Sequence, residues 1–270
     1  MSKYAQPDRR PAVIAGASSG IGAAAALTLA GAGYPVALGA RRVDRCAELV
    51  EEIRREGGEA VAHPLDVTDT GSVEAFAKAV TADLGDVEVL VCNAGKVGPG
   101  IVHEVSSERF AAELDLNVVG AHRLVRAFVP GMVGRTRGDV VFVSSDVAVR
   151  ARPFMAAYAA SKWGLEGMAH AMQMELEGSG VRVSIVRPGP TWSEMGTDWD
   201  DEEAAAVLTG WIKFGHARHS HFLKPAALAD AIATIVGAPR GVHLNLIEVN
   251  PEAPLDGRAP GERSDRLEEK

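Results

Sequence analysis

Residues 12–22 read Ala-Val-Ile-Ala-Gly-Ala-Ser-Ser-Gly-Ile-Gly, and an alanine-rich stretch follows them. This order predicts a short buried strand, a glycine-rich turn and then a helix. Because glycine lacks a Cβ atom, the backbone turns sharply here and approaches a phosphate, whose charge meets the free N–H groups at the start of the helix. The stretch therefore predicts a nucleotide-binding unit, with a glycine-rich turn that binds no ligand as the alternative. The candidate cofactor-binding residues are Gly16, Ser18, Ser19, Gly20, Ile21 and Gly22.

Short apolar runs alternate with longer helical patterns along the chain. Several runs are almost continuously apolar, which is typical of strands covered by helices on both faces. The alternation predicts an α/β fold, a Rossmann-like doubly wound parallel seven-stranded sheet with helices on both faces. The predicted strands cover residues 12–15, 35–40, 59–63, 87–91, 140–144, 181–186 and 244–249. The predicted helices cover residues 21–31, 43–56, 71–84, 107–135 with a break, 154–177 and 225–236.

The sequence contains no linker, repeat or change of composition that would divide it. We therefore expect a single dinucleotide-binding catalytic domain over residues 1–270. Residues 189–224 lack the strand signals found around them and are too long for an ordinary connection, which predicts a substrate lid. Residues 251–270 are rich in Pro, Gly, Glu and Arg, and we expect a flexible tail there.

Composition and charge restrict the class of protein and its partners. Apolar residues make up 47% of the chain and charged residues 24%, as in ordinary globular enzymes. A net charge of -8 argues against nucleic acid or anionic lipid as a partner. The sequence shows neither an apolar run of the ~20 residues of a membrane span nor a secretory signal. Its 2 cysteines have no metal or redox spacing, so we expect a soluble cytoplasmic protein.

The residues that follow the second predicted strand indicate which nucleotide is bound. In a dinucleotide-binding fold, an acidic residue roughly 20 positions after the glycine turn binds the ribose 2′-hydroxyl of NAD. Here Arg41 and Arg42 follow the strand instead, and guanidinium groups suit a 2′-phosphate. The sequence therefore predicts NADP(H), while a solvated helix start remains the alternative for these arginines, above all for Arg42.

Tyr158 and Lys162 occur as Tyr-Ala-Ala-Ser-Lys in a helical pattern, which places both side chains on one face of a helix. A nearby ammonium favours the phenolate, so Lys162 is expected to bring the pKa of Tyr158 closer to neutrality. Ser145 stands at the carboxyl end of a predicted strand, where open α/β sheets gather their ligands. A Tyr–Lys pair alone usually means a surface pair, but together with Ser145 it predicts a catalytic site.

Taken in order, these motifs resemble the short-chain dehydrogenase/reductase family in its single-domain, NADP(H)-preferring form. The resemblance extends from Gly16 to about Val249. Its matching elements are the glycine loop, Leu65-Asp66-Val67, Asn93-Ala94-Gly95, Asn117, Ser145, Tyr158 with Lys162, and Pro188-Gly189 with Ser193.

The resemblance implies a role for each catalytic residue. Tyr158 would be the general acid in reduction and the general base in oxidation. Lys162 would lower the pKa of Tyr158 and bind the nicotinamide ribose, and Ser145 would donate a hydrogen bond to the substrate oxygen. Asn117 would hold a water molecule that links Lys162 to solvent, although by itself it reads as a helix cap or kink residue.

The resemblance also implies cofactor contacts outside the glycine loop. Asp66 would accept a hydrogen bond from the adenine amino group, and a turn or helix-cap role is compatible with this. The small residues of Asn93-Ala94-Gly95 would lie beside the adenosine, unless they only end a strand. The other implied contacts are Val67, Tyr158, Lys162, Pro188, Gly189 and Ser193. Mild departures from the family pattern fall at Ala15, Cys92 and Ser193, where family members usually carry Thr, Asn and Thr.

The expected lid contains most of the tryptophan of the chain. Its large apolar residues predict an apolar pocket and a hydrophobic ketone or secondary alcohol as substrate, although they would equally anchor the lid to the core. These residues are Trp192, Met195, Trp199, Trp211, Phe214 and Phe222. The same segment carries His216, His219 and His221, but no acid or thiol completes a ligand set, so we expect lid or interface residues and no metal.

The leading hypothesis is an NADP(H)-dependent oxidoreductase that interconverts a carbonyl and a secondary alcohol on a small to medium apolar substrate. One alternative is a 3-oxoacyl-thioester reductase, and a less favoured one is a regulatory protein that senses NADP(H) without catalysis. An acyl carrier would dock on basic residues, for which the candidates are Arg123, Arg126, Arg135 and Arg137, unless these only face solvent. The resemblance further implies a homotetramer or homodimer, packed through the long helices near Asn117 and Tyr158.

Overall fold

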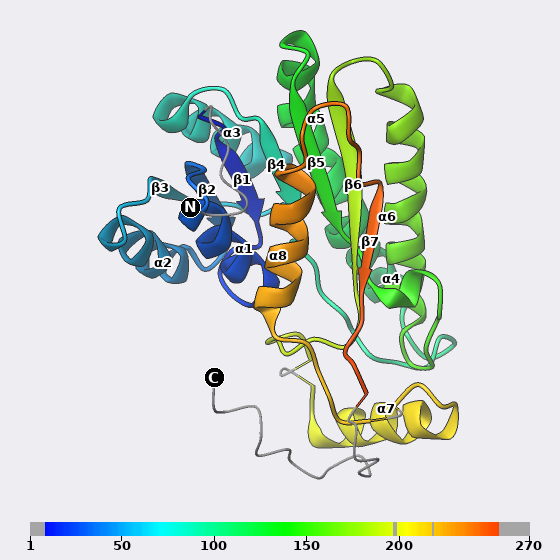
Figure 1. Ribbon diagram of the computed structural model, residues 1–270. Helices are drawn as coiled ribbons and strands as arrows, with labels where there is room; N and C mark the ends of the chain where they lie inside the picture. Colours follow the sequence, from blue (N-terminus) through cyan, green and yellow to red (C-terminus); the bar gives the residue numbers. More distant parts are fainter. Residues whose placement is uncertain (1–8, 197–198, 218, 254–270) are drawn as a thin grey trace.

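A computed structural model describes residues 9–253 except 197–198 and 218. Figure 1 shows a single central sheet with helices on both faces. The strands are β1 (Ala12–Ala15), β2 (Val36–Ala40), β3 (Ala60–Pro64), β4 (Val89–Cys92), β5 (Gly138–Val143), β6 (Val181–Pro188) and β7 (Leu246–Val249). All 7 strands are parallel and stand in the order β3-β2-β1-β4-β5-β6-β7. The predicted α/β fold is confirmed.

The helices form a layer on each face of the sheet, and one helix lies beyond its edge. One layer holds α1 (Gly20–Gly31), α2 (Val43–Arg55) and α8 (Pro225–Val236). The other holds α3 (Thr70–Leu84), α5 (Gly120–Gly134) and α6 (Ala156–Glu175), and α4 (Ser107–Leu114) packs against α6. Helix α7 (Asp201–Lys213) lies at the edge where the strands end (Figure 1).

Alternation along the strands separates two apolar cores. In β1, Ala12 and Ile14 belong to the core under α1 and α8, whereas Val13 and Ala15 belong to the core under α3 and α5. Every residue of β1, β2, β4 and β5 is buried. Because both faces of these strands are covered, nearly every position is apolar, which explains the continuous apolar runs of the sequence.

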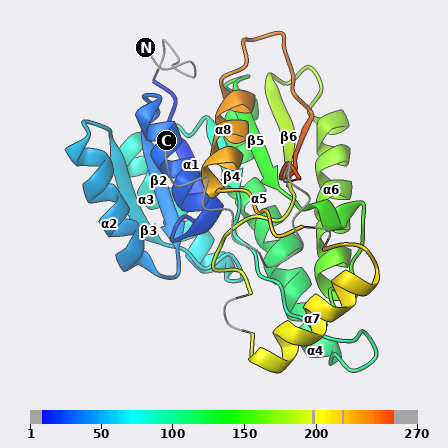
Figure 2. The same cartoon turned by 60° about the horizontal axis from the view of Figure 1, so that its bottom comes forward.

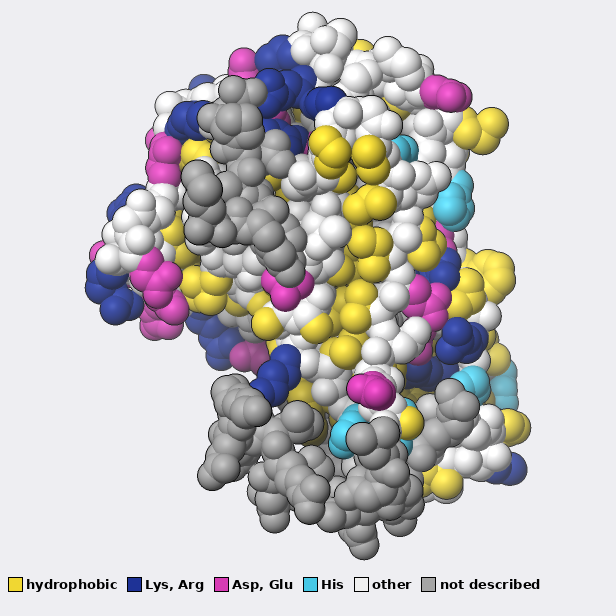
Figure 3. Space-filling view, in the orientation of Figure 1, with side chains coloured by type: hydrophobic (Ala, Val, Ile, Leu, Met, Phe, Trp, Pro, Cys, Tyr) yellow, Lys and Arg dark blue, Asp and Glu magenta, His cyan; other side chains and the backbone are white. Residues whose placement is uncertain are grey.

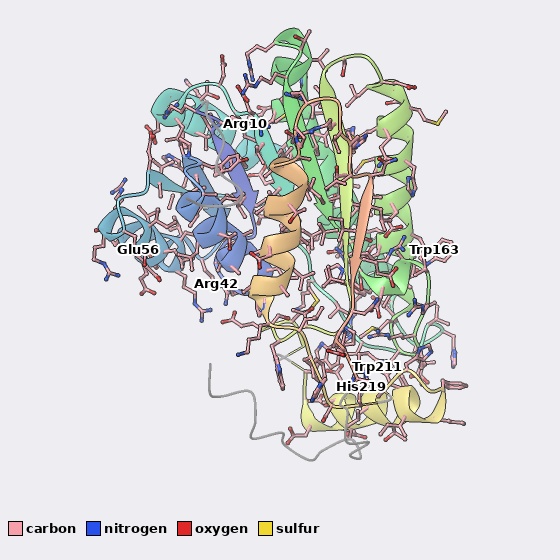
Figure 4. The ribbon with its side chains drawn as sticks, viewed as in Figure 1. Arg10, Arg42, Glu56, Trp163, Trp211 and His219 are labelled. Atoms are coloured by element: carbon pink, nitrogen blue, oxygen red, sulfur yellow. The ribbon has the colours of Figure 1, made fainter. Side chains whose placement is uncertain are left out.

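The strand order reverses direction between β1 and β4, which places a switch point at the carboxyl edge of the sheet. The segment between β6 and α8, including α7, covers that edge (Figure 1). Figure 4 places Arg10 at the opposite edge, and Arg42 and Trp211 on the side of α7. Loops that follow neighbouring strands therefore meet at one end of the molecule.

Three regions refine the expectations from sequence. The helical pattern of residues 107–135 is divided into α4, a π-helical segment (Asp115–Val119) and α5, which locates the expected break. The segment expected to be a lid contains α7, whose first turn is fixed by a capping box between Asp200 and Glu203. From residue 254 onward, the expected tail lies outside the described residues. No helix in the described ranges is both long and apolar enough to cross a membrane.

Candidate active site

The turn between β1 and α1 requires glycine at its corners. Gly16 and Gly20 have φ angles of +76° and +56°, in the left-handed region that favours glycine. A Cβ on Gly22 would lie 2.2 Å from the carbonyl oxygen of Gly16, so α1 begins directly against the turn. Asn93 closes the turn from β4, because its Nδ2 donates to the same oxygen at 3.0 Å. Ser19 precedes α1 without capping it, which leaves the first N–H groups of the helix for a ligand.

Arg42 adds an anion-binding cluster beside this turn. Its guanidinium donates to Ser18 Oγ at 3.1 and 3.3 Å and to Ser19 Oγ at 3.0 Å. Its Nη1 also lies 2.7 Å from Oε2 of Glu194, and Arg45 Nη1 lies 2.5 Å from Oε1 of the same carboxylate. A carboxylate is thus bound where arginine and serine groups converge. Positive charge and hydroxyl donors in one place are what a phosphate group requires.

Arg41 follows β2, and Asp66 follows the neighbouring strand β3. Thr68 donates to the Asp66 carboxylate from its hydroxyl at 2.7 Å and from its N–H at 2.9 Å. These two bonds lower the pKa of Asp66, and the charge of Arg41 adds to the effect. Val67 is buried and packs closely on Gly120, where a Cβ would come within 2.7 Å of it. Asp66 therefore acts as an ionised turn residue in the structure, and its contact with adenine stays a prediction.

Tyr158 and Lys162 lie one turn apart on α6 and are both buried. Lys162 Nζ lies 5.6 Å from the centre of the Tyr158 ring and donates to the carbonyl oxygen of Val143 at 2.8 Å. Burial lowers the pKa of Lys162 to about 8. Burial raises the pKa of Tyr158 to about 12 and outweighs the lowering effect of a hydrogen bond with Ser145. The expected approach of the Tyr158 pKa to neutrality is therefore wrong for the protein chain by itself, since desolvation is the larger effect.

Ser145 follows β5 and is buried beside Tyr158. Its Oγ accepts from the N–H of Val147 and donates to Asp146 Oδ1, both at 3.3 Å. Asp146 forms a buried ion pair with Arg152, whose guanidinium lies 4.8 Å from the centre of the Trp211 ring on α7. This chain of contacts connects the expected lid to the site. The sequence reading missed Asp146, although an acid directly after Ser145 was a visible signal.

Asn117 lies in the π-helical segment and is 1% exposed. Its Oδ1 accepts from the N–H of Lys96, and its Nδ2 donates to the Lys96 carbonyl and to Ser161 Oγ, all at 2.9 Å. A Cβ on Gly95 would lie 3.1 Å from Asn117 Oδ1 and 3.7 Å from Lys162 Nζ. Gly95 is therefore small because these two polar side chains approach its backbone.

A buried ionic network lies one helical turn beyond Lys162 on α6. Glu166, one turn further along α6, accepts from Ser144 Oγ at 2.7 Å and from Arg187 at 2.7 and 3.0 Å. Arg187 Nη1 also lies 2.9 Å from Glu248 of β7. The network holds α6 in place against β6 and β7, and the sequence reading did not identify it.

The segment after β6 reaches back to the glycine turn. Pro188 ends β6, and the N–H of Gly189 donates to the carbonyl of Val249 at 2.8 Å. Ser193 Cβ lies 3.4 Å from the place of a Cβ on Gly20. Ser193 is thus close enough to the turn to contact the same ligand.

The histidines of this segment do not form a metal centre in the structure. The rings of His219 and His221 lie with their centres 6.0 Å apart, and Figure 4 shows His219 near Trp211. Within the described part of the chain, no three His, Cys, Asp or Glu side chains are arranged to hold a metal ion.

A cavity of about 310 Å³ opens beside the segment that follows β4. It lies between the segment after β4, helix α4 and helix α7, and Figure 2 shows the two helices side by side. Val97, in its wall, packs in one apolar cluster with Tyr158, and Trp199 packs against that cluster. Val97 therefore connects the wall of the cavity with the surroundings of Tyr158. Its lining residues are Lys96, Val97, Gly98, Pro99, Arg109, Ala112, Glu113, Leu116, Trp199 and Glu203.

With this geometry in view, comparison with known proteins identifies the family. The family model described as short chain dehydrogenase matches residues 10–204. The chain belongs to the short-chain dehydrogenase family. It is an oxidoreductase, as the members of this family are.

Three relatives illustrate the similarity. Glycine betaine reductase ATRR of Emericella nidulans is 36% identical over 240 residues, which are 89% of this chain but only 18% of that protein. An alcohol dehydrogenase from the archaeon Thermococcus sibiricus, solved with 5-hydroxy-NADP, is 32% identical with a TM-score of 0.77, over 90% of this chain and 96% of that one. A variant of actinorhodin polyketide ketoreductase, solved with NADPH, is 28% identical with a TM-score of 0.78, over 92% and 98%.

Proposed function

We propose that this short-chain dehydrogenase transfers hydride between NADP(H) and a small to medium apolar ketone or secondary alcohol. The observation that carries the proposal is the meeting of four buried polar side chains under an apolar wall at the carboxyl edge of the sheet. These side chains are Asn117, Ser145, Tyr158 and Lys162. The bound nicotinamide ring supplies or accepts the hydride.

The residues present fit the proposed cofactor. The glycine turn brings the uncapped start of α1 to the place of a pyrophosphate. The cluster of Arg42, Ser18 and Ser19 already binds a carboxylate and suits the 2′-phosphate of NADP(H). We propose the adenine beside Asp66, and the nicotinamide end beside Ser193 and Lys162. The relatives solved with NADP-type nucleotides support this choice.

The polar residues divide the work on the substrate. Ser145 and Tyr158 would hold the substrate oxygen, and Tyr158 would supply the proton during reduction. Lys162, with a pKa of about 8, exchanges a proton near neutrality and would restore the one that Tyr158 gives up. The side chain of Asn117 is engaged by Lys96 and Ser161, so we assign it the positioning of the backbone beside Lys162.

We further propose that residues 189–224 act as a substrate lid on one catalytic domain. Arg152 stacks on Trp211, and Trp199 Nε1 lies 3.5 Å from the carbonyl of Val97 in the cavity wall, so the segment contacts both the cavity and the residues after β5. These contacts fit a substrate lid, and they fit equally a segment that is simply anchored to the core.

Assembly into a homodimer or homotetramer is also part of this proposal. Trp163 and Met174 are 57% and 79% exposed on α6, and Val119 is 41% exposed before α5. Figure 3 shows a further band of apolar side chains down the face on which α8 and β7 lie. Apolar surfaces on long helices and on an edge strand are typical of subunit interfaces. Light scattering would give the mass of the assembly.

The alternative of a 3-oxoacyl-thioester reductase is favoured by the likeness to the polyketide ketoreductase. The alternative is weakened because most of the basic residues expected to dock a carrier are already paired. Arg123, Arg135 and Arg137 are each paired with an acid, Asp115, Asp86 and Glu88 respectively. Arg126 is exposed and remains a candidate for carrier contact.

The substitution Tyr158→Phe tests the catalytic assignment. We expect NADPH binding to be retained, because the aromatic ring stays, and turnover of ketones to fall by about 10²–10⁴-fold, because the hydroxyl that donates the proton is lost. Tyr34→Phe, a buried tyrosine beside Arg10 at the opposite edge, is the matched control and should keep parental turnover. Unchanged turnover in Tyr158→Phe would refute the mechanism. A parent that binds NADPH without any turnover of ketones or alcohols would favour the sensing alternative.

A further inference from the structure

Glu113 is a buried carboxyl group to which the proposed reaction gives no role. It lies on α4 and is 8% exposed. Its Oε2 accepts from the N–H of Gly98 at 3.2 Å, whereas its Oε1 is buried without a hydrogen-bond partner among the described residues. A buried polar atom left unpaired costs about 1–3 kcal/mol. Such an atom in the wall of a cavity points to a partner that comes from outside the chain.

The position of Glu113 connects it to the reaction. It lines the cavity of about 310 Å³ together with Val97 and Trp199. Those two residues also pack with or against the apolar cluster of Tyr158. A substrate whose carbonyl lies at Tyr158 therefore extends along this wall toward Glu113.

Cations lie near Glu113, but none of the described residues donates a hydrogen bond to its Oε1. Arg109 donates to the carbonyl of Pro99 at 2.7 Å and lies 4.0 Å from Glu203, the other acid of the cavity. Burial raises the pKa of Glu113 to about 7, even though the charges of Arg109, Lys96 and Lys162 act in the opposite direction. An added cation in the cavity would lie beside Oε1 and favour the charged form of the carboxyl group. The indole ring of Trp199 suits such a group, because aromatic faces attract cations.

We propose that the cavity binds the positively charged nitrogen of the substrate, with Glu113 as its counter-charge and Trp199 as its aromatic wall. The substrate class is then an aldehyde, a ketone or the matching alcohol with an apolar body and an alkylammonium end. This inference rests on the proposed function, because the carbonyl is placed at Tyr158.

A pair of isosteric alcohols tests the charge preference without requiring turnover. Choline carries a trimethylammonium group, whereas 3,3-dimethylbutan-1-ol carries an uncharged tert-butyl group of the same shape. Calorimetry would measure the binding of both to the NADP+ complex of the parent, of Glu113→Gln and of Glu108→Gln. Glu108 is exposed on the same helix and gives the same change of charge away from the cavity.

We expect the parent and Glu108→Gln to bind choline at least about tenfold more tightly than the neutral alcohol, which corresponds to about 1.4 kcal/mol. Glu113→Gln should lose this preference and keep its affinity for the neutral alcohol. Equal binding of the two alcohols by the parent, or an equal loss of both in Glu113→Gln, would overturn the proposal. Failure of the proposed function is a separate result, seen as absent NADPH binding or absent ketone turnover in the parent.

Proton release gives a readout that a structural role of Glu113 would not change. A cation beside Glu113 favours the carboxylate and lowers its pKa, so choline binding at pH 7 should release protons. Calorimetry in buffers of different ionisation enthalpy measures that release. It should be absent with 3,3-dimethylbutan-1-ol and in Glu113→Gln, and choline binding to the parent without proton release would contradict the assignment.

Discussion

Glu113, Tyr158 and Lys162 share a buried region where water contributes little to the stability of a charge. Burial raises the pKa of Glu113 to about 7 and that of Tyr158 to about 12, and it lowers that of Lys162 to about 8. The three groups are electrostatically coupled, because the charge of Glu113 raises the pKa of the other two. The ionisation of Glu113 therefore affects Tyr158, the proposed proton donor, without contact between the two side chains.

The raised pKa of Glu113 predicts a pH-dependent effect on stability. Between its ordinary value of 4.5 and about 7, the folded protein binds more protons than the unfolded chain. Stability therefore falls as the pH rises through this window and stays lower above it. Glutamine does not ionise, so Glu113→Gln should raise the free energy of unfolding relative to the parent by about 1–3 kcal/mol more at pH 8 than at pH 5.

Urea denaturation at both pH values measures the effect of Glu113→Gln. Glu108→Gln, at an exposed position on the same helix, should change stability by a similar small amount at pH 5 and pH 8. A Glu113→Gln effect that does not depend on pH would show that the carboxyl group is already ionised without cost.

At the level of elements, the link between α2 and the segment after β6 connects cofactor binding to the proposed lid. Glu194, in the segment after β6, pairs with two arginines at the start of α2. Its Oε2 lies 2.7 Å from Nη1 of Arg42, and its Oε1 lies 2.5 Å from Nη1 of Arg45. A 2′-phosphate at Arg42 would compete with this carboxylate. A nucleotide bound at Arg42 would therefore release a contact of the proposed lid.

Glu194→Gln tests this competition. We expect the Kd of NADPH to fall by about 2- to 5-fold, since an exposed ion pair is worth up to about 1 kcal/mol, and the Kd of NADH to stay unchanged. Fluorescence titration measures both constants. Glu48→Gln, an exposed acid of α2 that takes no part in the cluster, is the control. An equal change in the Kd of NADPH and of NADH would mean that Glu194 acts on the fold and not on the phosphate site.

Sequence patterns predicted the strands and most of the helices, and they missed features that depend on tertiary contacts. The strands of the sheet and helix α8 were predicted because apolar runs and a Pro at the helix start are local signals. Helix α7 is an exception, because it was not predicted although the capping box of Asp200 and Glu203 is a local signal of a helix start. Glu113 was missed, because no local signal shows that this acid of α4 is buried in a cavity wall.

The site residues divide in the same way. Ser145, Tyr158 and Lys162 were placed together because strand ends and helical spacing fix their positions in any fold of this kind. The raised pKa of Tyr158 was not foreseen, because part of its burial comes from Val97, which is distant in the chain. Helical spacing gives the distance between two side chains but not their exposure to solvent.

On the scale of the whole molecule, chemistry and stability occupy opposite edges of the sheet. The carboxyl edge carries the proposed catalytic groups and the cavity. The amino edge carries a buried ionic cluster around Asp139, which is 1% exposed. Asp139 pairs with Arg10 and, at 2.6 Å, with Arg182, and Arg10 also donates to the carbonyl of Val236 at 2.9 Å. The cluster joins the start of the chain to β5, β6 and α8.

Asp139→Asn should therefore destabilise the protein without altering the site. Removing the charge of Asp139 takes away the acid paired with Arg182 and one of the two acids paired with Arg10, and breaking a buried network in this way costs about 3–5 kcal/mol. Denaturation by urea should show this loss, while kcat at a temperature well below the transition stays at the parental value. Asp86→Asn, which breaks the exposed pair with Arg135, should cost under about 1 kcal/mol. A fall in kcat at full folding would contradict the separation of the two edges.

The π-helical segment Asp115–Val119 has a consequence for how this chain tolerates changes of length. An α-helix turns about 100° per residue, and a π-turn holds one residue more than the α-helical period needs. Deletion of one residue there would restore a regular helix and rotate everything on one side of the gap. Either Asn117 would leave Lys96 and Ser161, or Leu124 and Phe128 of α5 would leave the core. Shortening of the chain by evolution or by design must therefore fall elsewhere, for example in the exposed residues 101–104.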